Sequence, residues 1–327
     1  MTRWAAGCVL FSCLATAGCS GVQSALDPAG EEALQISRLF QAMLIGGAAI
    51  WLSVVALLLY AIRQERRRFS EAASGKLILW GGGIFPSVTL LLLLAFGLWQ
   101  MPSLRPAAQA ATAGGLRIEV TGKQFWWSVV YRRPEAAPIV SANEIRLPVG
   151  ERVELLLKSD DVIHSFWIPA LAGKVDMIPG RTNRLSLLAN KSGSFRGPCA
   201  EYCGTSHALM AFSAIAMEPA AFREWLEAKA RPADGAARSG QRLFIQNGCG
   251  ACHRVAGSEA QGAIGPDLSH LGSRATLGAG ILPNTKEAIA RFIADPDAIK
   301  PGAKMPAFHM LPPQDIEAIA DYLKGLQ

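Results

Sequence analysis

The stretch CAEYCGTSHALM, residues 199–210, places four soft donor side chains on one short segment. Its two cysteines are four residues apart, a histidine follows four residues later, and a methionine three residues after that. Thiolate, imidazole and thioether groups together suit copper, whereas a structural zinc site is complete with cysteine and histidine and leaves Met210 unexplained. A disulfide between Cys199 and Cys203 is the further alternative in an oxidising compartment. The donor set therefore favours copper over zinc or a disulfide.

The chain around this stretch is long and apolar. It has 327 residues, 50% of them hydrophobic, and a net charge of +6 at pH 7. Acidic and basic residues are interspersed along it, and no segment concentrates enough positive charge to bind nucleic acid. Its 7 cysteines lie near the N-terminus and in two close pairs, which favours cofactor sites over a disulfide framework.

The N-terminus predicts export from the cytoplasm. Residues 1–19 contain Arg3, an apolar run and then small residues, which is the pattern of a cleaved signal peptide. The ending ATAGC also resembles a bacterial lipoprotein signal, in which Cys19 would carry the lipid anchor. An ordinary signal peptide with an unmodified Cys19 is the alternative.

Two apolar stretches predict a transmembrane hairpin in the N-terminal segment, residues 20–114. Residues 39–62 and 77–100 are each close to the ~20 residues that cross a bilayer as a helix. The stretch RQERRRFSEAASGK between them has five basic and two acidic residues, so the positive-inside rule places it in the cytoplasm. Everything after Pro102 is then expected on the periplasmic or outer face, beyond a linker rich in Ala, Pro and Gly.

In residues 115–230 the long apolar stretches give way to short runs in which apolar and polar residues alternate. Segments such as LRIEVTG, FWWSVVY and RVELLLKS, punctuated by Gly, Pro and Asn, predict an antiparallel β-sandwich or barrel. His164 lies in the turn-rich stretch DDVIHSFWIPAL, and CAEYCGTSHALM lies between two predicted strands. Loops at one end of a sandwich converge, so His164 is a candidate to join the same metal site.

The last segment, residues 236–327, contains the motif CGACH, which is the attachment signature of a c-type haem. The thiols of Cys249 and Cys252 would add to the haem vinyl groups, and His253 would bind the iron. A thioredoxin-like redox pair is the alternative, which the following histidine and the absence of a βαβ pattern disfavour.

The second axial position of such a haem is expected to hold a methionine, because thioether ligation raises the reduction potential of the iron. Met305, in the stretch GAKMPAF, is the candidate, and Met310 is its rival. His270 and His309 are expected to be solvated loop residues rather than ligands.

Three helical patterns flank the motif: GQRLFIQN, TKEAIARFIAD and PQDIEAIADYLKGLQ. The last of them carries one apolar stripe suited to packing on the first, formed by Ile316, Ile319, Ala320 and Leu323.

The copper motif, with DDVIHSF upstream and GKVDMIPGR between the two, resembles cytochrome c oxidase subunit II, and the resemblance runs from the first apolar stretch to about residue 228. It implies a cupredoxin fold that holds CuA, a centre of two copper ions. The expected architecture is therefore multidomain: a two-helix transmembrane hairpin, an all-β cupredoxin-like sandwich and an all-α cytochrome c domain.

The resemblance also implies roles for individual residues. The copper ligand set would have six members: Cys199 and Cys203 as bridges, His164 and His207 at one copper each, Met210 as a weak ligand, and Glu201 through its backbone carbonyl. The Glu201 carboxylate would in addition reach a magnesium ion at the boundary with subunit I. Where most relatives carry an electron-accepting tryptophan, GKQFWW places Phe125. Trp126 and Trp127 are then the candidate electron-transfer aromatics, with a place in the hydrophobic core as their alternative role.

A subunit II with a C-terminal cytochrome c domain resembles the haem-fused, caa-type oxidases of bacteria. The stretch GPDLSHLGSR also resembles the class I cytochromes c. This resemblance implies that the carbonyl of Pro266 orients the proximal histidine. The implied protein is the electron-transfer subunit of a cytochrome-c oxidase in the bacterial inner membrane. It would accept electrons at haem c and pass them through CuA to subunit I, which reduces oxygen to water and pumps protons.

The partners that the resemblance implies are subunits I and III and an electron donor such as a bc complex or a soluble cytochrome c. The alternative function is the electron-accepting subunit of a CuA-containing nitric oxide reductase. This chain does not distinguish the two enzymes, because oxidase and reductase differ in the active site of the partner subunit.

Overall fold

The computed structural model describes residues 19–63, 70–100, 116–233 and 238–327. The expected signal peptide before Cys19, the linker after Gln100, and parts of the basic loop and of the second linker lie outside the described residues. The described residues divide into two compact units, of which those between 35 and 100 form one and those of 19–34 and 116–327 form the other.

Two long helices account for the predicted hairpin. The first is α2 (Glu31–Arg63); the second runs without a break through α3 (Glu71–Leu77), a π-helical segment η1 (Ile78–Ile84) and α4 (Phe85–Gln100). Glu31–Arg63 has 33 residues and Glu71–Trp99 has 29, so at 1.5 Å per residue they span about 50 Å and about 44 Å. Both are long and apolar enough to cross the ~30 Å core of a bilayer, which confirms the prediction of two apolar helices.

The second helix begins before the predicted residue 77. The Ser70 side chain accepts a hydrogen bond from the Ala73 backbone N–H at 3.3 Å and so caps the helix, and Glu71 lies in its first turn. A serine followed by an acid is an ordinary helix-start signal that hydropathy alone does not detect.

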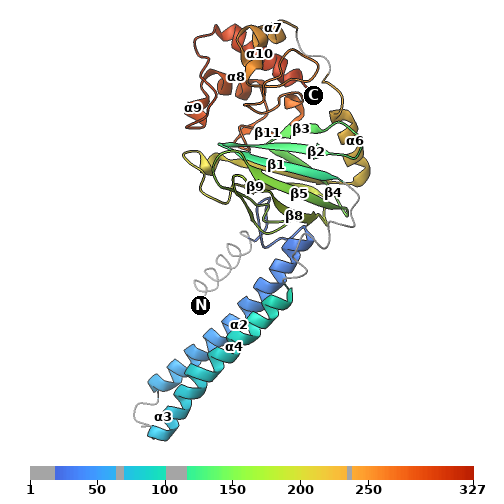
Figure 1. The fold of residues 1–327 in the computed structure, drawn as a ribbon. Helices are drawn as coiled ribbons and strands as arrows, with labels where there is room; N and C mark the ends of the chain where they lie inside the picture. The colour runs from blue at the N-terminus through green and yellow to red at the C-terminus, as the bar shows by residue number, and fades with distance from the viewer. Residues whose placement is uncertain (1–18, 64–69, 101–115, 234–237) are drawn as a thin grey trace, which may run out of the picture. The chain divides into compact units, whose positions relative to one another are not determined.

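Residues 116–233 form a sandwich of two main sheets, drawn in green to yellow in Figure 1. One sheet has the strand order β3-β2-β1-β5-β8, the other has the order β4-β10-β9, and a separate pair joins β6 to β7. Their bounds are β1 (Arg117–Lys123), β2 (Trp126–Arg132), β3 (Ile139–Ala142), β4 (Glu144–Pro148), β5 (Arg152–Ser159), β6 (His164–Phe166), β7 (Val175–Met177), β8 (Asn183–Leu188), β9 (Gly193–Pro198) and β10 (Ala211–Met217).

The sandwich is confirmed, but the expectation that it is antiparallel is wrong. Strand β1 pairs with β5 in parallel, and β10 pairs with β4 in parallel, while the remaining pairs are antiparallel. Alternating hydrophobicity identifies a strand with one buried face, but it carries no information on the direction of the neighbouring strand.

The core of the sandwich follows the period-two alternation of its strands. In β2 the residues Trp127, Val129 and Tyr131 point inward and are at most 2% exposed. The helix α6 (Pro219–Lys229) buries Phe222 and Leu226, and the rings of Phe222 and Tyr131 lie 6.4 Å apart. This packing fixes β2, which lies next to the stretch GKQF that approaches the metal loop.

The C-terminal segment is mainly helical, with α7 (Arg238–Gln246), the short helix η4 (Cys249–Ala251), α8 (Lys286–Ala294), α9 (Pro296–Ile299) and α10 (Pro313–Gly325), plus the two-residue strands β11 (Thr276–Leu277) and β12 (Leu282–Pro283). The predicted stripe on α10 is buried, at no more than 7% exposure. Helix α10 packs on α7, with the rings of Phe244 and Tyr322 at 5.7 Å and a close approach at Gly240.

The sandwich and the C-terminal helical domain belong to the same compact unit and are joined by hydrogen bonds. Backbone N–H of Ala275 donates to the Glu144 carboxylate at 2.7 Å, and the Ser206 hydroxyl donates to the Pro301 carbonyl at 2.6 Å. Ser206 lies within the CAEYCGTSHALM loop, so the helical domain contacts the candidate copper site directly.

Candidate metal centres

The loop from Cys199 to Met210 is held closed at its base. It connects the antiparallel strands β9 and β10, whose register pairs Pro198 with Ala211. The first and last residues of the loop then meet, because the backbone N–H of Cys199 donates to the Met210 carbonyl at 2.8 Å. A loop fixed at both ends by a sheet presents its donor atoms in a set geometry.

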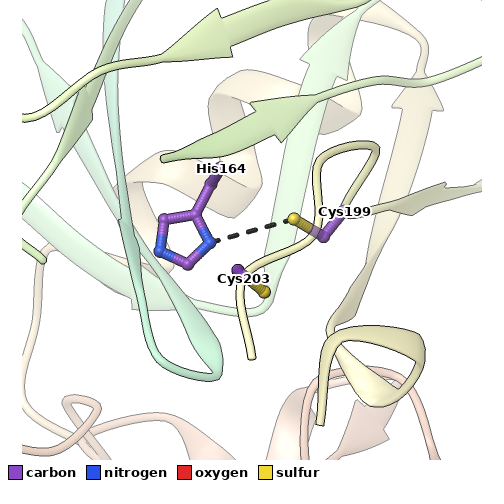
Figure 2. Close-up of side chains that lie close together, drawn as sticks. All are labelled: His164, Cys199 and Cys203. Atoms are coloured by element: carbon purple, nitrogen blue, oxygen red, sulfur yellow. Dashed lines mark hydrogen bonds between the residues drawn. The ribbon is translucent and has the colours of Figure 1, made fainter. Parts of the chain in front are cut away.

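His164 reaches this loop from β6, 35 residues upstream. A β-bridge joins Phe166 to Cys199, and the Ala200 N–H donates to the Ser165 carbonyl at 3.0 Å. As Figure 2 shows, the imidazole points at the two cysteines, with Nδ1 3.8 Å from Sγ of Cys199. The ligand atoms of His164, Cys199 and Cys203 all lie within 4.8 Å of one another, and all three residues are buried. The structure thus brings together residues that the sequence places far apart.

The remaining predicted copper ligands surround the same sulfur atoms. Sγ of Cys203 lies 3.6 Å from Nδ1 of His207 and 3.7 Å from Sδ of Met210, which is only 1% exposed. The backbone carbonyl of Glu201 lies 3.2 Å from Sγ of Cys199, whereas the Glu201 carboxylate is turned away and lies 3.9 Å from Nζ of Lys174. All six predicted donor groups are therefore gathered at one site.

The two thiols are free rather than joined in a disulfide. Hydrogen bonding from Cys203, together with His164, lowers the pKa of Cys199 to about 4 despite burial. The hydrogen bond with Cys199, burial and the negative charge on Cys199 in turn raise the pKa of Cys203. A site that keeps one thiolate at neutral pH is prepared for a cation, because the thiolate is the metal-binding form. The donor set of sulfur and imidazole, with a thioether added, fits copper.

Asp161 supports His164 and was missed in the sequence, although the stretch DDVIH contains it. Its Oδ1 lies 2.8 Å from Nε2 of His164, and its Oδ2 accepts the N–H of Gln124 at 2.7 Å. Burial alone would lower the pKa of His164, but its hydrogen bonds with Cys199 and Asp161 outweigh burial and raise it. Since Nε2 faces a carboxylate, Nδ1 is the nitrogen that faces the sulfur atoms.

Gly122 on β1 leaves room for this imidazole. A Cβ atom at that position would lie 2.7 Å from Cδ2 of His164, closer than real contacts allow. The ring of Trp127 lies 6.0 Å from the same imidazole, inside the core of the sandwich.

The CGACH motif lines a cavity of about 400 Å³ in the helical domain. Cys249, Cys252, His253 and Met305 all line it, and so do apolar side chains of α8 and α10. The volume falls within the ~300–1,000 Å³ usual for sites that bind small molecules or cofactors.

His253 is oriented as an iron ligand requires. Its Nδ1 lies 2.8 Å from the carbonyl of Pro266, so Nδ1 carries the proton and the lone pair of Nε2 stays available. Burial lowers the pKa of His253, which keeps the ring neutral. Gly265 permits this arrangement, because a Cβ there would lie 2.5 Å from Cε1 of His253.

The two candidate methionines differ in position. Met305 lines the cavity and packs against the core of the helical domain, whereas Met310 is 69% exposed. The expectation of a solvated His270 is wrong. His270 is buried, with Nδ1 2.8 Å from the Gln327 carbonyl and Nε2 3.2 Å from the Lys229 carbonyl, because the C-terminus and the end of α6 fold over it. His309 is exposed, as expected.

An orphaned polar atom shows that the cavity fits a haem. The guanidinium of Arg274 is buried and lines the cavity, and its Nε has no hydrogen-bond partner among the described residues. A buried donor without a partner is costly, and an anionic group inside the cavity would satisfy it. Haem supplies both an apolar ring for the apolar walls and carboxylates for such donors.

The sandwich contributes to the wall of the same cavity through Gln124, Phe125 and Trp126. The side-chain amide of Gln124 also donates to the backbone carbonyl of Cys203 at 2.6 Å. Phe125 is 6% exposed and lies against Gly204, which follows Cys203, and near Gly302 of the helical domain. Gln124 therefore touches both candidate centres, a relationship that sequence reasoning did not find.

The fold and the two donor sets define a cupredoxin-like metal domain joined to a cytochrome c domain. Comparison with known families agrees, since "Cytochrome C oxidase subunit II, periplasmic domain" matches residues 132–217 and "Cytochrome c" matches residues 237–327.

Individual relatives extend this similarity to almost the whole chain. The chain is 33% identical over 331 residues to cytochrome c oxidase subunit 2 of Alkalihalophilus pseudofirmus, which covers 97% of this chain and 95% of the relative. It is 34% identical over 226 residues to the Bacillus subtilis protein of the same name, covering 65% and 62% respectively. Among solved structures, the periplasmic domain of subunit II of cytochrome oxidase of Bradyrhizobium japonicum is 34% identical over 35% of this chain and 92% of that one, with a TM-score of 0.33. The chain belongs to the cytochrome c oxidase subunit 2 family, and it is a form of that subunit with a fused cytochrome c domain.

Membership of this family has consequences for cofactors, location and assembly. The subunit II domain implies copper of the CuA type, and the cytochrome c domain implies haem. The chain is a subunit of a cytochrome c oxidase, which implies that it associates with other oxidase subunits. Together with the two apolar helices, this indicates a membrane protein with a periplasmic domain.

Proposed function

We propose that this chain accepts electrons at a covalently bound haem c, passes them to a binuclear CuA centre, and delivers them to subunit I, where oxygen is reduced to water and protons are pumped. The observation that carries the proposal is Gln124, which lines the haem cavity and also donates a hydrogen bond to the backbone of Cys203. Gln124 therefore links the wall of the haem cavity to the copper loop, within one compact unit.

At the copper site the proposed ligand set is His164, Cys199, Glu201, Cys203, His207 and Met210. A pair of copper ions bound there supplies one-electron redox chemistry. Cys199 and Cys203 provide the thiolates, and the Asp161 carboxylate fixes the ring of His164. Because the loop is closed at its base and its donors are largely buried, the ligands need little movement when the charge at the site changes.

At the haem site Cys249 and Cys252 would form the thioether links, and His253 and Met305 would bind the iron. The support is their common position on one cavity and the neutral, oriented ring of His253. A thioether ligand and an apolar cavity both favour the reduced iron, which carries less charge.

The route between the centres is proposed to pass through Gln124 and Phe125, with Trp126 at the haem cavity. Trp127 is buried in the sandwich core beside His164, so its position supports a structural role. Phe125 lies against both domains, which supports the interpretation that a tethered haem replaces the surface tryptophan used with a separate donor.

The same proposal includes several partners and sites that follow from the resemblance to the family rather than from a contact seen in this chain. They are subunit III, a bc complex or soluble cytochrome c as donor, insertion of both apolar helices in the inner membrane, and a lipid on Cys19. A magnesium ion at the Glu201 carboxylate is likewise proposed, and the side chain is 44% exposed and free to turn toward a partner. The nitric oxide reductase alternative is not favoured, because the relatives of this chain carry the name of the oxidase subunit.

The test is spectroscopy and metal analysis of the purified intact complex. The expected result is a c-type haem band, the near-infrared band of mixed-valence copper, and about two copper ions for each haem-bearing chain in addition to any copper of subunit I. Stopped-flow reduction is expected to show the haem band change before the copper band. Iron without copper in this subunit, or copper reduction that precedes haem reduction, would reject the proposal.

A further inference from the structure

Lys300 carries a buried positive charge at the edge of the haem cavity. It follows α9, lines the cavity, and is only 4% exposed. Its Nζ donates a hydrogen bond of 2.8 Å to the carbonyl of Gly278. A lysine at this depth is rare, because removing an ammonium group from water is costly unless an anion compensates it.

No acidic side chain in the described part of the chain lies within ion-pair distance of this ammonium group. Asp297, the nearest acid in sequence, accepts the N–H of Gly302 at 2.7 Å. Burial without such a partner lowers the pKa of Lys300 to about 7. Among the described residues this ammonium group therefore has no carboxylate partner, and the charge that opposes the lowering of its pKa is that of the Cys203 thiolate.

The position of Lys300 selects the kind of anion. The rest of the cavity is lined mainly by apolar side chains, as suits the haem ring, and the haem carries two carboxylates that also need polar partners. Arg274 differs from Lys300, because its charge lies near the carboxylates of Asp267 and Glu144, although its Nε has no partner among the described residues. Among the described residues, Lys300 has no carboxylate at ion-pair distance, and the Cys203 thiolate is the negative group that acts on its charge.

We propose that the ammonium group of Lys300 pairs with a propionate carboxylate of the bound haem at the seam with the copper loop. The inference rests on the proposed haem binding. Pro301, the next residue, accepts the Ser206 hydroxyl of that loop, so Lys300 is held in place from the copper side. The pair neutralises a carboxylate close to the iron, and it thereby stabilises the reduced haem.

The test compares three variants of the intact oxidase in spectroelectrochemical titrations that follow the haem and copper bands separately. Lys300→Met removes the charge and keeps an apolar stem. The haem is expected to become easier to oxidise, with its oxidised-to-reduced ratio at fixed potential rising about tenfold, which is about 59 mV. Lys300→Arg keeps the charge and is expected to stay close to wild type.

Lys324→Met is the matched control. Its Nζ also donates to a glycine carbonyl at 2.8 Å, in this case Gly272, but Lys324 does not line the cavity. The control loses the same charge and the same kind of hydrogen bond, and its haem potential is expected to stay at the wild-type value. Equal shifts in Lys300→Met and Lys324→Met would overturn the proposal, and so would a shift confined to the copper band.

The wild-type protein provides an independent test if the Lys300→Met variant does not fold or does not incorporate haem. An experimental structure of the haem-loaded complex is expected to place a propionate oxygen within about 4 Å of Nζ of Lys300. Both propionates directed away from Lys300 would overturn the proposal. Absence of haem from wild-type protein would instead refute the proposed function, and the two failures are thus distinguishable.

Discussion

Oδ1 of Asp161 lies 2.8 Å from Nε2 of His164, on the side of the imidazole opposite to the cysteines. A carboxylate in this place selects the tautomer of His164, fixes the orientation of its imidazole ring and makes Nδ1 more basic.

Asp161→Asn is therefore expected to weaken copper binding by about 10- to 100-fold, because the amide keeps a polar contact but loses the charge. The measurement is competition with a graded series of copper chelators, followed in the near-infrared. Asp160→Asn is the matched control, since Asp160 is the adjacent residue and its exposed carboxylate pairs with Lys123. Equal copper loss in both variants would contradict the supporting role of Asp161.

Cys203→Ser is expected to abolish the copper band and leave the haem band at full intensity. Sγ of Cys203 is close to both His207 and Met210, so its loss removes the centre of the donor set. Absorption spectra and metal analysis of the purified complex give both readouts. Thr205→Ser, a mild change at an exposed position of the same loop, serves as the control, and normal copper spectra in Cys203→Ser would show the ligand assignment to be wrong.

Met305→Ala is expected to lower the haem reduction potential without loss of covalent attachment. The thioether favours reduced iron, whereas attachment depends on Cys249 and Cys252. Potentiometric titration and haem staining of denatured protein measure the two effects. Met310→Ala is the control, because Met310 is 69% exposed. If Met310→Ala lowered the haem potential and Met305→Ala left it unchanged, Met310 would be the ligand in place of Met305.

Glu119→Gln is expected to reduce the acid sensitivity of the sandwich. Burial alone would raise the pKa of Glu119, but hydrogen bonds from Lys158 and Arg132 outweigh it and lower the pKa below its ordinary value of 4.5. The folded state then binds the proton less readily than the unfolded chain, where the carboxyl titrates at that ordinary value. The stabilisation is therefore complete above about pH 4.5 and is lost as the pH falls through the lowered pKa of the folded state.

The measurement for Glu119→Gln is urea unfolding from pH 7 to pH 3, followed by tryptophan fluorescence of the intact chain in detergent. The variant is expected to be less stable at pH 7 and to lose less stability on acidification. Glu151→Gln is the control, because the ion pair of Glu151 with Arg223 is largely exposed. Parallel pH profiles for wild type and Glu119→Gln would contradict the prediction.

Local sequence patterns were sufficient for much of the architecture. The apolar lengths of α2 and of the second long helix, the alternation in β2 and the stripe on α10 are properties of consecutive residues, and each was found in the structure. The donor atoms of CAEYCGTSHALM and CGACH could be named for the same reason, since each set is held on a single short segment.

The predictions from sequence that were wrong, and the features that were missed, all involve contacts between residues far apart in the chain. The parallel pairing of β1 with β5, the burial of His270 and the support of His164 by Asp161 all depend on how separate segments meet. The resemblance to a family placed His164 at the copper loop, but periodicity gave no indication of the bridge between Phe166 and Cys199 that brings it there.

The sequence by itself determined which chemical groups this protein offers: two cysteine pairs, the histidines and methionines near them, and two apolar helices. Only the tertiary structure decided that Gln124 lines the haem cavity while bonding to the copper loop, and that Lys300 is buried with no carboxylate of the described residues at ion-pair distance. The physical reason is that donor identity is fixed by covalent chemistry along the chain, whereas burial and distance arise when the sandwich and the helical domain pack together.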